Sequence, residues 1–444
     1  MLKHKRRSVI KLAGSAAAVA STGMAGILAT GRTPAYAQQK TVHWLRWVDF
    51  VPASDQLLRK ELVPQAEKEL GIKINLETVN GNDLQPRTTA AIQSGAGPDL
   101  IMAFNNTTYI YDNSVVDLTD LAEDLDKREG GIFKYCRSFC SNGKIFMSMP
   151  WAVPGAMISY RKSWFIESGG PADGSFPKNW DEYRTLGKKL KAAGHPIGQT
   201  LGHTFGDAPT FTYPYMWSWG GKEVEQDGKT VAINSKETIE SVKFMTAFWK
   251  EAHDEGALAW DDTNNNRAFL SGTVAATLNG ASIYIEASRK PDTYQTEKGK
   301  PMKDDILCAP LPAGPAGQFG MHLMQSDMLM KYSKNQDAAK QFLKWIHTEK
   351  NYEKWFLSQK GYSTPCTAKW EQHKLWTQDP VMAPFKVAAR LGQAPGFAGL
   401  PNQKAAEALS KYIITDMYAK AVQGMPAEES VKWAESELKK IYSA

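Results

Sequence analysis

Two side-chain amides stand where a small ligand could be held. Leu100 to Phe104 is a continuous apolar run, the pattern of a strand covered on both faces, and Asn105 and Asn106 follow it directly. Ligands of open α/β sheets bind beyond the carboxyl ends of the strands, so we expect both amides to face a ligand. A plain connection from a helix through Pro98 into a strand would give the same spacing, and the pattern alone leaves both interpretations open.

The first predicted strand ends with an indole, and a carboxylate follows that strand. Thr41 to Trp47 predicts the opening strand, and Asp49 lies in its exit loop. Carboxylates and amides hydrogen-bond to hydroxyl groups, while aromatic rings cover apolar C–H faces. The combination is typical of a site that binds a polyhydroxylated molecule.

The second half of the chain offers a similar set. Residues 203–221 are the most aromatic stretch and include Asp207, Trp217 and Trp219, while Asn279 follows the apolar run 274–278. Asp207 precedes a predicted helix, whose free N-terminal amides could grip hydroxyls together with its carboxylate. The alternative is that the aromatic residues form one core face. Their spacing lets only some of them share a face, so we expect one or two to reach the ligand.

These residues need a scaffold that brings strand ends together. Strands over 41–47, 72–79 and 100–104 alternate with helices over 53–70 and 86–94, the second of which ends before Gly95. This βαβαβ order predicts a parallel sheet with right-handed crossovers. The length of 444 residues exceeds one typical core and favours two domains.

Several motifs carry a resemblance to a known family. The segment Gly95-Ala-Gly-Pro-Asp-Leu-Ile101 resembles the signature of the family 1 extracellular solute-binding proteins of ABC importers, the maltose-binding-protein-like family. Phe211-Thr-Tyr-Pro214 and Ala309-Pro-Leu-Pro312 are similar to elements of the same family, and the likeness runs in order along most of the chain. It implies an α/β fold of two lobes, each a mostly parallel sheet flanked by helices, with three interlobe crossings.

The resemblance also implies a division of the chain. We expect a first lobe of residues 38–151 and 310–332 and a second lobe of residues 152–309 and 333–444, with the third crossing at 331–335. Trp151, near the first crossing, is either a packing residue at the hinge or a platform facing the cleft.

The same likeness extends the candidate site. It places residues 207–210 along the cleft and Phe397 where relatives offer an aromatic ring to the ligand. The chain departs from the pattern at residues 281–284, where many relatives carry a stacking Trp and Tyr284 is the nearest replacement. The expected ligand-binding residues are Trp47, Asp49, Asn105, Asn106, Trp151, Asp207, Trp217, Trp219, Asn279 and Phe397.

Residues 1–37 predict an export segment. Lys5-Arg-Arg-Ser-Val-Ile-Lys11 resembles a twin-arginine signal, although Lys5 and Val9 replace the usual residues, and Ala35-Tyr-Ala37 fits cleavage before Gln38. All charges in this segment are basic, and the whole chain has 53 Lys and Arg against 47 Asp and Glu. The mature protein is therefore close to neutral, which argues against a nucleic-acid or membrane-surface partner. We expect a soluble periplasmic monomer.

Four cysteines, Cys136, Cys140, Cys308 and Cys366, leave the redox question open. In an oxidising compartment Cys136 and Cys140 could pair, and four buried free thiols would fit the sequence equally well. No histidine stands at a ligand spacing beside them, so we expect no metal and no cofactor.

The leading functional prediction is a periplasmic protein that captures a sugar or oligosaccharide and delivers it to an ABC importer. The alternatives are a binder of another solute, such as a polyol or polyamine, and a secreted glycoside-processing enzyme. The enzyme would need two carboxylates about 5–9 Å apart across the scissile bond, and no motif pairs two in this way. We therefore expect no catalytic residues.

Overall fold

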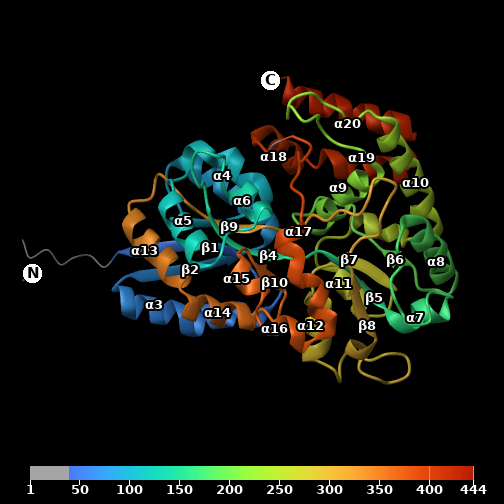
Figure 1. The fold of residues 1–444 in the computed structure, drawn as a ribbon, viewed down its shortest axis with the longest axis horizontal. Helices are drawn as coiled ribbons and strands as arrows, with labels where there is room; N and C mark the ends of the chain where they lie inside the picture. The colour runs from blue at the N-terminus through green and yellow to red at the C-terminus, as the bar shows by residue number, and fades with distance from the viewer. Residues whose placement is uncertain (1–39, 400, 444) are drawn as a thin grey trace, which may run out of the picture. The chain divides into compact units, whose positions relative to one another are not determined.

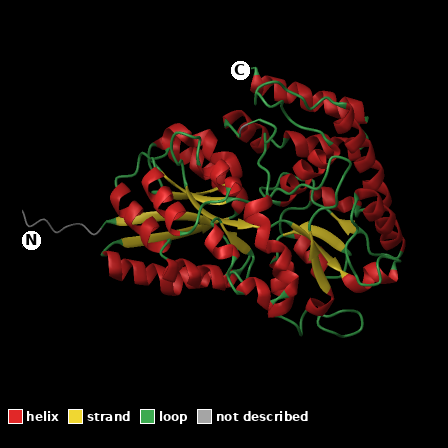
Figure 2. Ribbon diagram, in the orientation of Figure 1, coloured by secondary structure: helices red, strands yellow, loops and turns green. Residues whose placement is uncertain are grey.

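The protein forms two β-sheets surrounded by helices. The computed structural model describes residues 40–399 and 401–443, and the predicted export segment lies outside them. Figures 1 and 2 show the strands gathered in two groups, with helices on their faces. No helix in the described part of the chain is long and apolar enough to cross a membrane.

The larger sheet has six strands in the order β10-β4-β9-β3-β1-β2. Both β2 and β3 run parallel to the central β1, which confirms the predicted βαβαβ unit. The other three pairings are antiparallel, because β9, β4 and β10 belong to segments that enter this sheet from elsewhere in the chain. Its strands are β1 (Thr41–Trp47), β2 (Lys73–Val79), β3 (Leu100–Phe104), β4 (Met149–Pro154), β9 (Gln325–Leu329) and β10 (Ser363–Pro365).

The smaller sheet has four strands in the order β6-β7-β5-β8. Only β6 and β7 are parallel, whereas β5 is antiparallel to both of its neighbours. The prediction of two mostly parallel sheets is therefore wrong: strands at the crossings pair against the direction of their neighbours. The strands are β5 (Met157–Arg161), β6 (Ile197–Gly198), β7 (Ala276–Asn279) and β8 (Ile306–Ala309).

Most of the α-helices pack with one sheet or the other. The helices in the core of the larger sheet are α2 (Pro52–Leu57), α3 (Val63–Leu70), α4 (Leu84–Ser94), α5 (Thr119–Arg128), α6 (Lys134–Cys140), α13 (Gln336–Ile346), α14 (Glu349–Ser358), α15 (Ala368–Glu371), α16 (Leu375–Gln378) and α17 (Ala388–Leu391). Those in the core of the smaller sheet are α7 (Lys162–Glu167), α8 (Trp180–Ala192), α9 (Asp207–Trp219), α10 (Lys236–Ala252), α19 (Ile413–Val422) and α20 (Ala427–Tyr442). A satellite cluster contains α11 (Asn264–Leu270) and α12 (Ser282–Arg289), and α18 (Gln403–Ser410) contributes to both main cores.

The expected division of the chain differs from the structure after residue 333. Buried residues from 338 to 394 join the core of the larger sheet, β10 pairs with β4, and Phe342 of α13 meets Trp44 of β1 with ring centroids 5.0 Å apart. The chain therefore does not cross at 331–335, and only residues after 394 return to the smaller sheet. The apolar face of α13 covers the larger sheet, and no motif in the sequence indicates which sheet a helix will cover.

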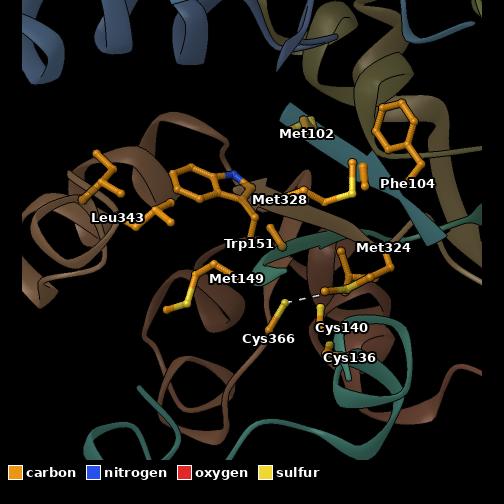
Figure 3. Close-up of a cluster of buried hydrophobic side chains, with 14 of the residues drawn as sticks. Met102, Phe104, Cys136, Cys140, Met149, Trp151, Met324, Met328, Leu343 and Cys366 are labelled. Carbon is orange, nitrogen blue, oxygen red and sulfur yellow. Dashed lines mark hydrogen bonds between the residues drawn. The ribbon is translucent and has the colours of Figure 1, made fainter. Parts of the chain in front are cut away.

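All four cysteines are buried and free. Figure 3 shows Cys136 and Cys140 of α6 near Cys366, and Cys366 lies with Sγ 3.9 Å from Sδ of Met324. Burial raises the pKa of the Cys140 thiol to about 12. Among the described residues no group of His, Cys, Asp and Glu side chains is arranged to hold a metal ion.

Candidate ligand-binding site

Three adjoining cavities lie between the two sheets. The Asn105 cavity is lined by residues such as Gln85, Phe104, Asn105 and Tyr412, and the Asp49 cavity by Trp47, Asp49, Asn82 and Asp262. The Asp207 cavity is lined by Asp207, Asp262, Asn279 and Tyr362 among others. Phe205 lines all three, and Phe50 lines the two that contain carboxylates.

Two buried carboxylates of the smaller lobe stand at the start of α9. The Asp207 N–H donates to Oδ1 of Asp262 at 2.8 Å, and Asn265 Nδ2 donates to Oδ2 of Asp207 at 2.5 Å. Burial, reinforced by the neighbouring Asp262, raises the pKa of Asp207 well above its ordinary value. Burial also raises the pKa of Asp262 to about 6. Two carboxyl groups so placed are harder to ionise than an isolated carboxyl group.

A third carboxylate faces the cavities from the larger sheet. Asp49 follows β1, and its Oδ1 accepts from the Val51 N–H at 2.8 Å while its Oδ2 accepts from Gln359 Nε2 at 2.7 Å. Burial raises the pKa of Asp49 to about 6, against the effect of these two hydrogen bonds. The larger lobe therefore presents the carboxyl oxygens of Asp49 to the cavities, and the smaller lobe presents those of Asp207 and Asp262.

Aromatic rings form much of the remaining wall. Phe205 stacks on Phe104 with centroids 4.8 Å apart and planes 12° apart, and Trp47 meets Phe205 edge-on at 5.7 Å. Tyr362 lies parallel to Trp47 at 6.4 Å. These rings come from both sides of the space between the sheets, so a ligand here would meet apolar faces beside the carboxylates.

Two residues of the Asn105 cavity have a left-handed backbone that side chains disfavour. Asn105 has φ +49° and Tyr412 has φ +55°, and both line this cavity. Asn105 is held by Met324: its N–H donates to the Met324 carbonyl at 2.8 Å, and its Oδ1 accepts from the Met324 N–H at 3.0 Å. Such conformations cost of order 1–3 kcal/mol and gather at functional sites. The wall of this cavity therefore contains two residues whose backbone is locally strained.

Five of the ten expected residues line these cavities. They are Trp47, Asp49, Asn105, Asp207 and Asn279. The strand-end argument placed the first three and Asn279, and the helix-start argument placed Asp207. Tyr284, the nearest replacement for a stacking Trp, instead donates to Asp379 Oδ2 at 2.7 Å.

The other five residues line none of the three cavities. Trp217 is 1% exposed, donates to Glu223 Oε2 at 2.9 Å and meets Phe397 at 4.8 Å in the core of the smaller sheet. Trp219 packs on Phe244 at 5.1 Å. The helix begins at the cavity and rises about 1.5 Å per residue, so Trp217 and Trp219 lie about 15–18 Å along the axis from Asp207.

The two remaining residues are buried in the larger lobe. Trp151 lies against Trp355 with ring centroids 4.6 Å apart and beneath the guanidinium of Arg46 at 4.4 Å. Of the two alternatives for Trp151, these contacts fit a packing residue and not a platform that faces the cleft. Asn106 has no exposed surface, and neither its Oδ1 nor its Nδ2 finds a hydrogen-bond partner among the described residues. Asn106 lies at a kink of the helical segment Asn105–Ser114, and it does not line the cavity that Asn105 and Thr107 line.

Sequence reasoning missed four residues that matter here. Phe205 stands two positions before the helix start that drew attention to Asp207, so the same signal could have found it. Phe50 follows Asp49 in the same exit loop. Asp262 and Tyr362 lie in a loop before α11 and just before β10, where no strand end or motif marks them as ligand contacts.

Comparison with known proteins identifies the family. The pattern of the bacterial extracellular solute-binding proteins matches residues 53–353. The chain belongs to this family. A protein of Brucella abortus strain 2308, named only as a binding protein, is 25% identical over 314 residues, which cover 66% of this chain and 68% of that protein.

Solved structures show the same fold. A maltose-bound MalE3 of T. maritima superposes with a TM-score of 0.73 at 18% identity, over 90% of this chain and 99% of that one. A solute-binding protein of an ABC transporter from Agrobacterium radiobacter K84, in complex with ribitol, gives 0.71 at 18% identity, over 90% and 98%. This family 1 chain thus has the two-lobe periplasmic-binding-protein fold, with one sheet in each lobe.

Membership fixes the broad role. Proteins of this family are binding proteins of ABC transporters and not enzymes, and they act outside the cytoplasm on small-molecule ligands. The chain is an extracellular solute-binding protein of the kind that works with ABC transporter subunits.

Proposed function

We propose that the protein captures a carbohydrate in the periplasm and delivers it to an ABC importer. The observation that carries this proposal is the mixture of side chains around the Asp207 cavity: two carboxyl groups, the Asn279 amide, and the rings of Phe205 and Tyr362. Sugars present hydroxyl edges and apolar faces, which such a mixture matches. A buried hydroxyl left without a partner would cost about 1–3 kcal/mol, so the polar residues set specificity.

The ligand holds the two lobes together. Asp49 comes from the larger lobe and Asp207 from the smaller one, so a molecule that contacts both stabilises the closed arrangement. The importer then recognises the closed shape. Scattering curves recorded with and without saturating ligand should differ, and identical curves would speak against closure.

The ligands of two structural neighbours are polyhydroxylated molecules. The T. maritima neighbour holds maltose, which supports the carbohydrate class, the Agrobacterium neighbour holds ribitol, which is a polyol, and both share the fold at 18% identity. Because identity is low and the stacking Trp of many relatives is absent, the individual sugar does not transfer.

A thermal-shift screen tests the proposal. Monosaccharides, disaccharides, trisaccharides, polyols, polyamines and amino acids are added at increasing concentration to the mature protein. A ligand that binds only the folded state raises Tm by mass action, about 2.7 kcal/mol at a hundredfold excess over Kd. A carbohydrate hit supports the proposal, and a screen in which only another class responds overturns it.

An amine-bearing solute is the second candidate. Asp49, Asp207 and Asp262 line two adjoining cavities, and no described residue lining either cavity is basic. A cationic amine would pair with these carboxylates and displace the proton held by Asp207 and Asp262. Calorimetry in buffers of different ionisation enthalpy separates the two classes. Binding of a cationic amine at pH 6–7 releases protons from the carboxyl groups of the protein, whereas binding of a neutral sugar releases few.

Export and lobe limits belong to the same proposal. We place the first lobe at 41–154 and 325–394 and the second at 157–309 and 403–443, following the sheets and cores. Export depends on Arg6 and Arg7 and leaves Gln38 first. Normal export of an Arg6→Lys/Arg7→Lys variant through the general secretory route would refute the twin-arginine part.

A further inference from the structure

Phe205 reaches across the space between the lobes into a seat on the larger one. It belongs to the loop before α9, yet its ring stacks on Phe104 at the end of β3 and meets Trp47 at the end of β1. Its backbone N–H donates to Oδ1 of Asn82 at 3.2 Å. The side chain is therefore a contact between lobes and not part of its own lobe's core.

Gly81 lies directly against the Phe205 ring. A Cβ placed on Gly81 would lie 2.4 Å from Cε1 and 2.6 Å from Cζ of Phe205, closer than real Cβ atoms approach other atoms. The φ of Gly81 is not in the left-handed range, so the backbone does not demand glycine. A larger residue at position 81 would instead overlap the Phe205 ring.

The seated ring separates two kinds of space. On one side lies the Asn105 cavity, whose polar groups are amides and hydroxyls such as Asn105, Gln85 and Tyr412 and whose lining contains no charged side chain. On the other side lie the Asp49 and Asp207 cavities with their three buried carboxylates. Phe205 is the residue that lines all three, and Gly81 and Asn82 line both the Asn105 and the Asp49 cavity, so the Phe205 ring lies where the cavities meet.

We propose that Phe205 determines ligand length. This rests on the proposed carbohydrate function. One sugar unit in the carboxylate cavities stacks on the ring, and the ring keeps a second unit out of the Asn105 cavity. Removing the ring joins the cavities, and the amides and hydroxyls of the Asn105 cavity then offer partners to a further unit.

The test compares affinities along series of increasing length. Calorimetry measures glucose, maltose and maltotriose, and the matching monomer, dimer and trimer of the β-1,3-glucose, mannose and xylose series, against the parent and Phe205→Ala. The parent gains no affinity with length. In Phe205→Ala the shortest ligand loses about tenfold because stacking is lost, and the ratio of dimer to monomer affinity rises about tenfold or more.

Phe50→Ala is the matched control. Phe50 is another half-buried ring that lines the two carboxylate cavities and does not line the Asn105 cavity. Its removal should weaken ligands of every length by the same factor. If Phe205→Ala behaves like Phe50→Ala, or if the parent already gains affinity with each added unit, the length assignment is wrong.

Gly81→Ala provides an independent arm that keeps the ring. Its methyl group prevents Phe205 from seating, so every ligand should bind about tenfold or more weakly, and Gly81→Ala/Phe205→Ala should restore binding of the dimer and trimer. A double variant no better than Gly81→Ala overturns the proposal. A parent that binds no sugar of any series, while melting cooperatively, overturns the carbohydrate function itself, and the length assignment falls with it.

Discussion

Two aromatic clusters lie at opposite ends of one helix and do different work. At the start of α9, Phe205 and the rings it touches, Phe104 and Trp47, all line the cavities between the lobes. Near its end, Trp217 belongs to the core of the smaller lobe, and the half-buried Trp219 and Phe397 pack against that core. The composition of the two clusters is alike. Distance from the helix start decides which rings can face a ligand, because only the first turn borders the space between the lobes.

The largest effect should come from the core cluster. Trp217→Ala removes a ring that is 1% exposed and leaves the Glu223 carboxylate without its 2.9 Å donor. The expected cost is about 3–5 kcal/mol in unfolding free energy. Chemical denaturation measures it, with Phe205→Ala as the comparison at about 1 kcal/mol. Equal losses in the two variants would mean that the rings do not differ in role.

The comparison also shows how far sequence reasoning reaches. The βαβαβ order, the strand ends near Trp47, Phe104 and Asn279, and a helix that starts close to Asp207 follow from local pattern, although Asp207 lies in the first turn of this helix and not in a loop before it. These strand ends and this helix start each lie at a cavity. Local pattern works there because a strand or helix end fixes the position of its own residues.

Other features depend on contacts far apart in the chain. The sequence could not assign α13 and β10 to the larger lobe, because an amphipathic helix shows that it covers a sheet but not which one. Asp262 and Tyr362 reach the site through loops whose paths tertiary packing sets. Asn106 shows the limit at a single residue, since it lies at a kink of the helical segment and is fully buried, while Asn105 and Thr107 on either side of it line the cavity.

The second effect is a pH dependence that belongs to the cavity carboxylates. Asp49 has a pKa raised to about 6 in the folded protein, where Asp55, Arg46 and Tyr362 also influence or face it. Because the folded protein holds the proton of the Asp49 carboxyl group more tightly than the unfolded chain, the proton adds to the free energy of unfolding. This contribution is complete below about pH 4 and is lost as the pH rises through 6. The stability of Asp49→Asn relative to the parent should therefore increase by about 1–3 kcal/mol between pH 4 and 6.5.

The measured quantity must be the difference in unfolding free energy between Asp49→Asn and the parent. Burial lowers the pKa of His253 to about 3 and of His322 to about 4, so these histidines make stability rise with pH over the same range. They are present in both proteins and cancel in the difference. Urea unfolding at half-unit pH steps gives the curve. A difference that stays constant from pH 4 to 6.5 would show that Asp49 titrates as an ordinary carboxylate.

A smaller effect is expected on affinity from Asp207→Asn. The amide keeps an oxygen for Asn265 but replaces the second carboxyl oxygen, which could bond to a ligand hydroxyl or amine, with an NH2 group. We expect about a tenfold loss for a sugar and a larger loss for a cationic amine, measured by calorimetry at pH 7. Asp227→Asn is the control, because Asp227 is an exposed carboxylate held by Thr230 in a turn that lines none of the three cavities. An equal loss in both variants would count against a role for Asp207 in the site.

The smallest effect is the one that sharpens the comparison most. Trp219 shares its helix with Asp207 but packs against Tyr215 at 6.3 Å and Phe244 at 5.1 Å on the side of the lobe that α10 covers. Trp219→Ala should change ligand affinity by less than about twofold, since no ligand reaches a ring some 18 Å along the axis from the cavity. Its stability cost stays below that of Trp217→Ala because the ring is only half-buried. Calorimetry with the sugar from the screen decides the matter. A tenfold loss in Trp219→Ala, with the melting curve intact, would move the binding surface to the far end of α9, and the two aromatic clusters would have to exchange roles.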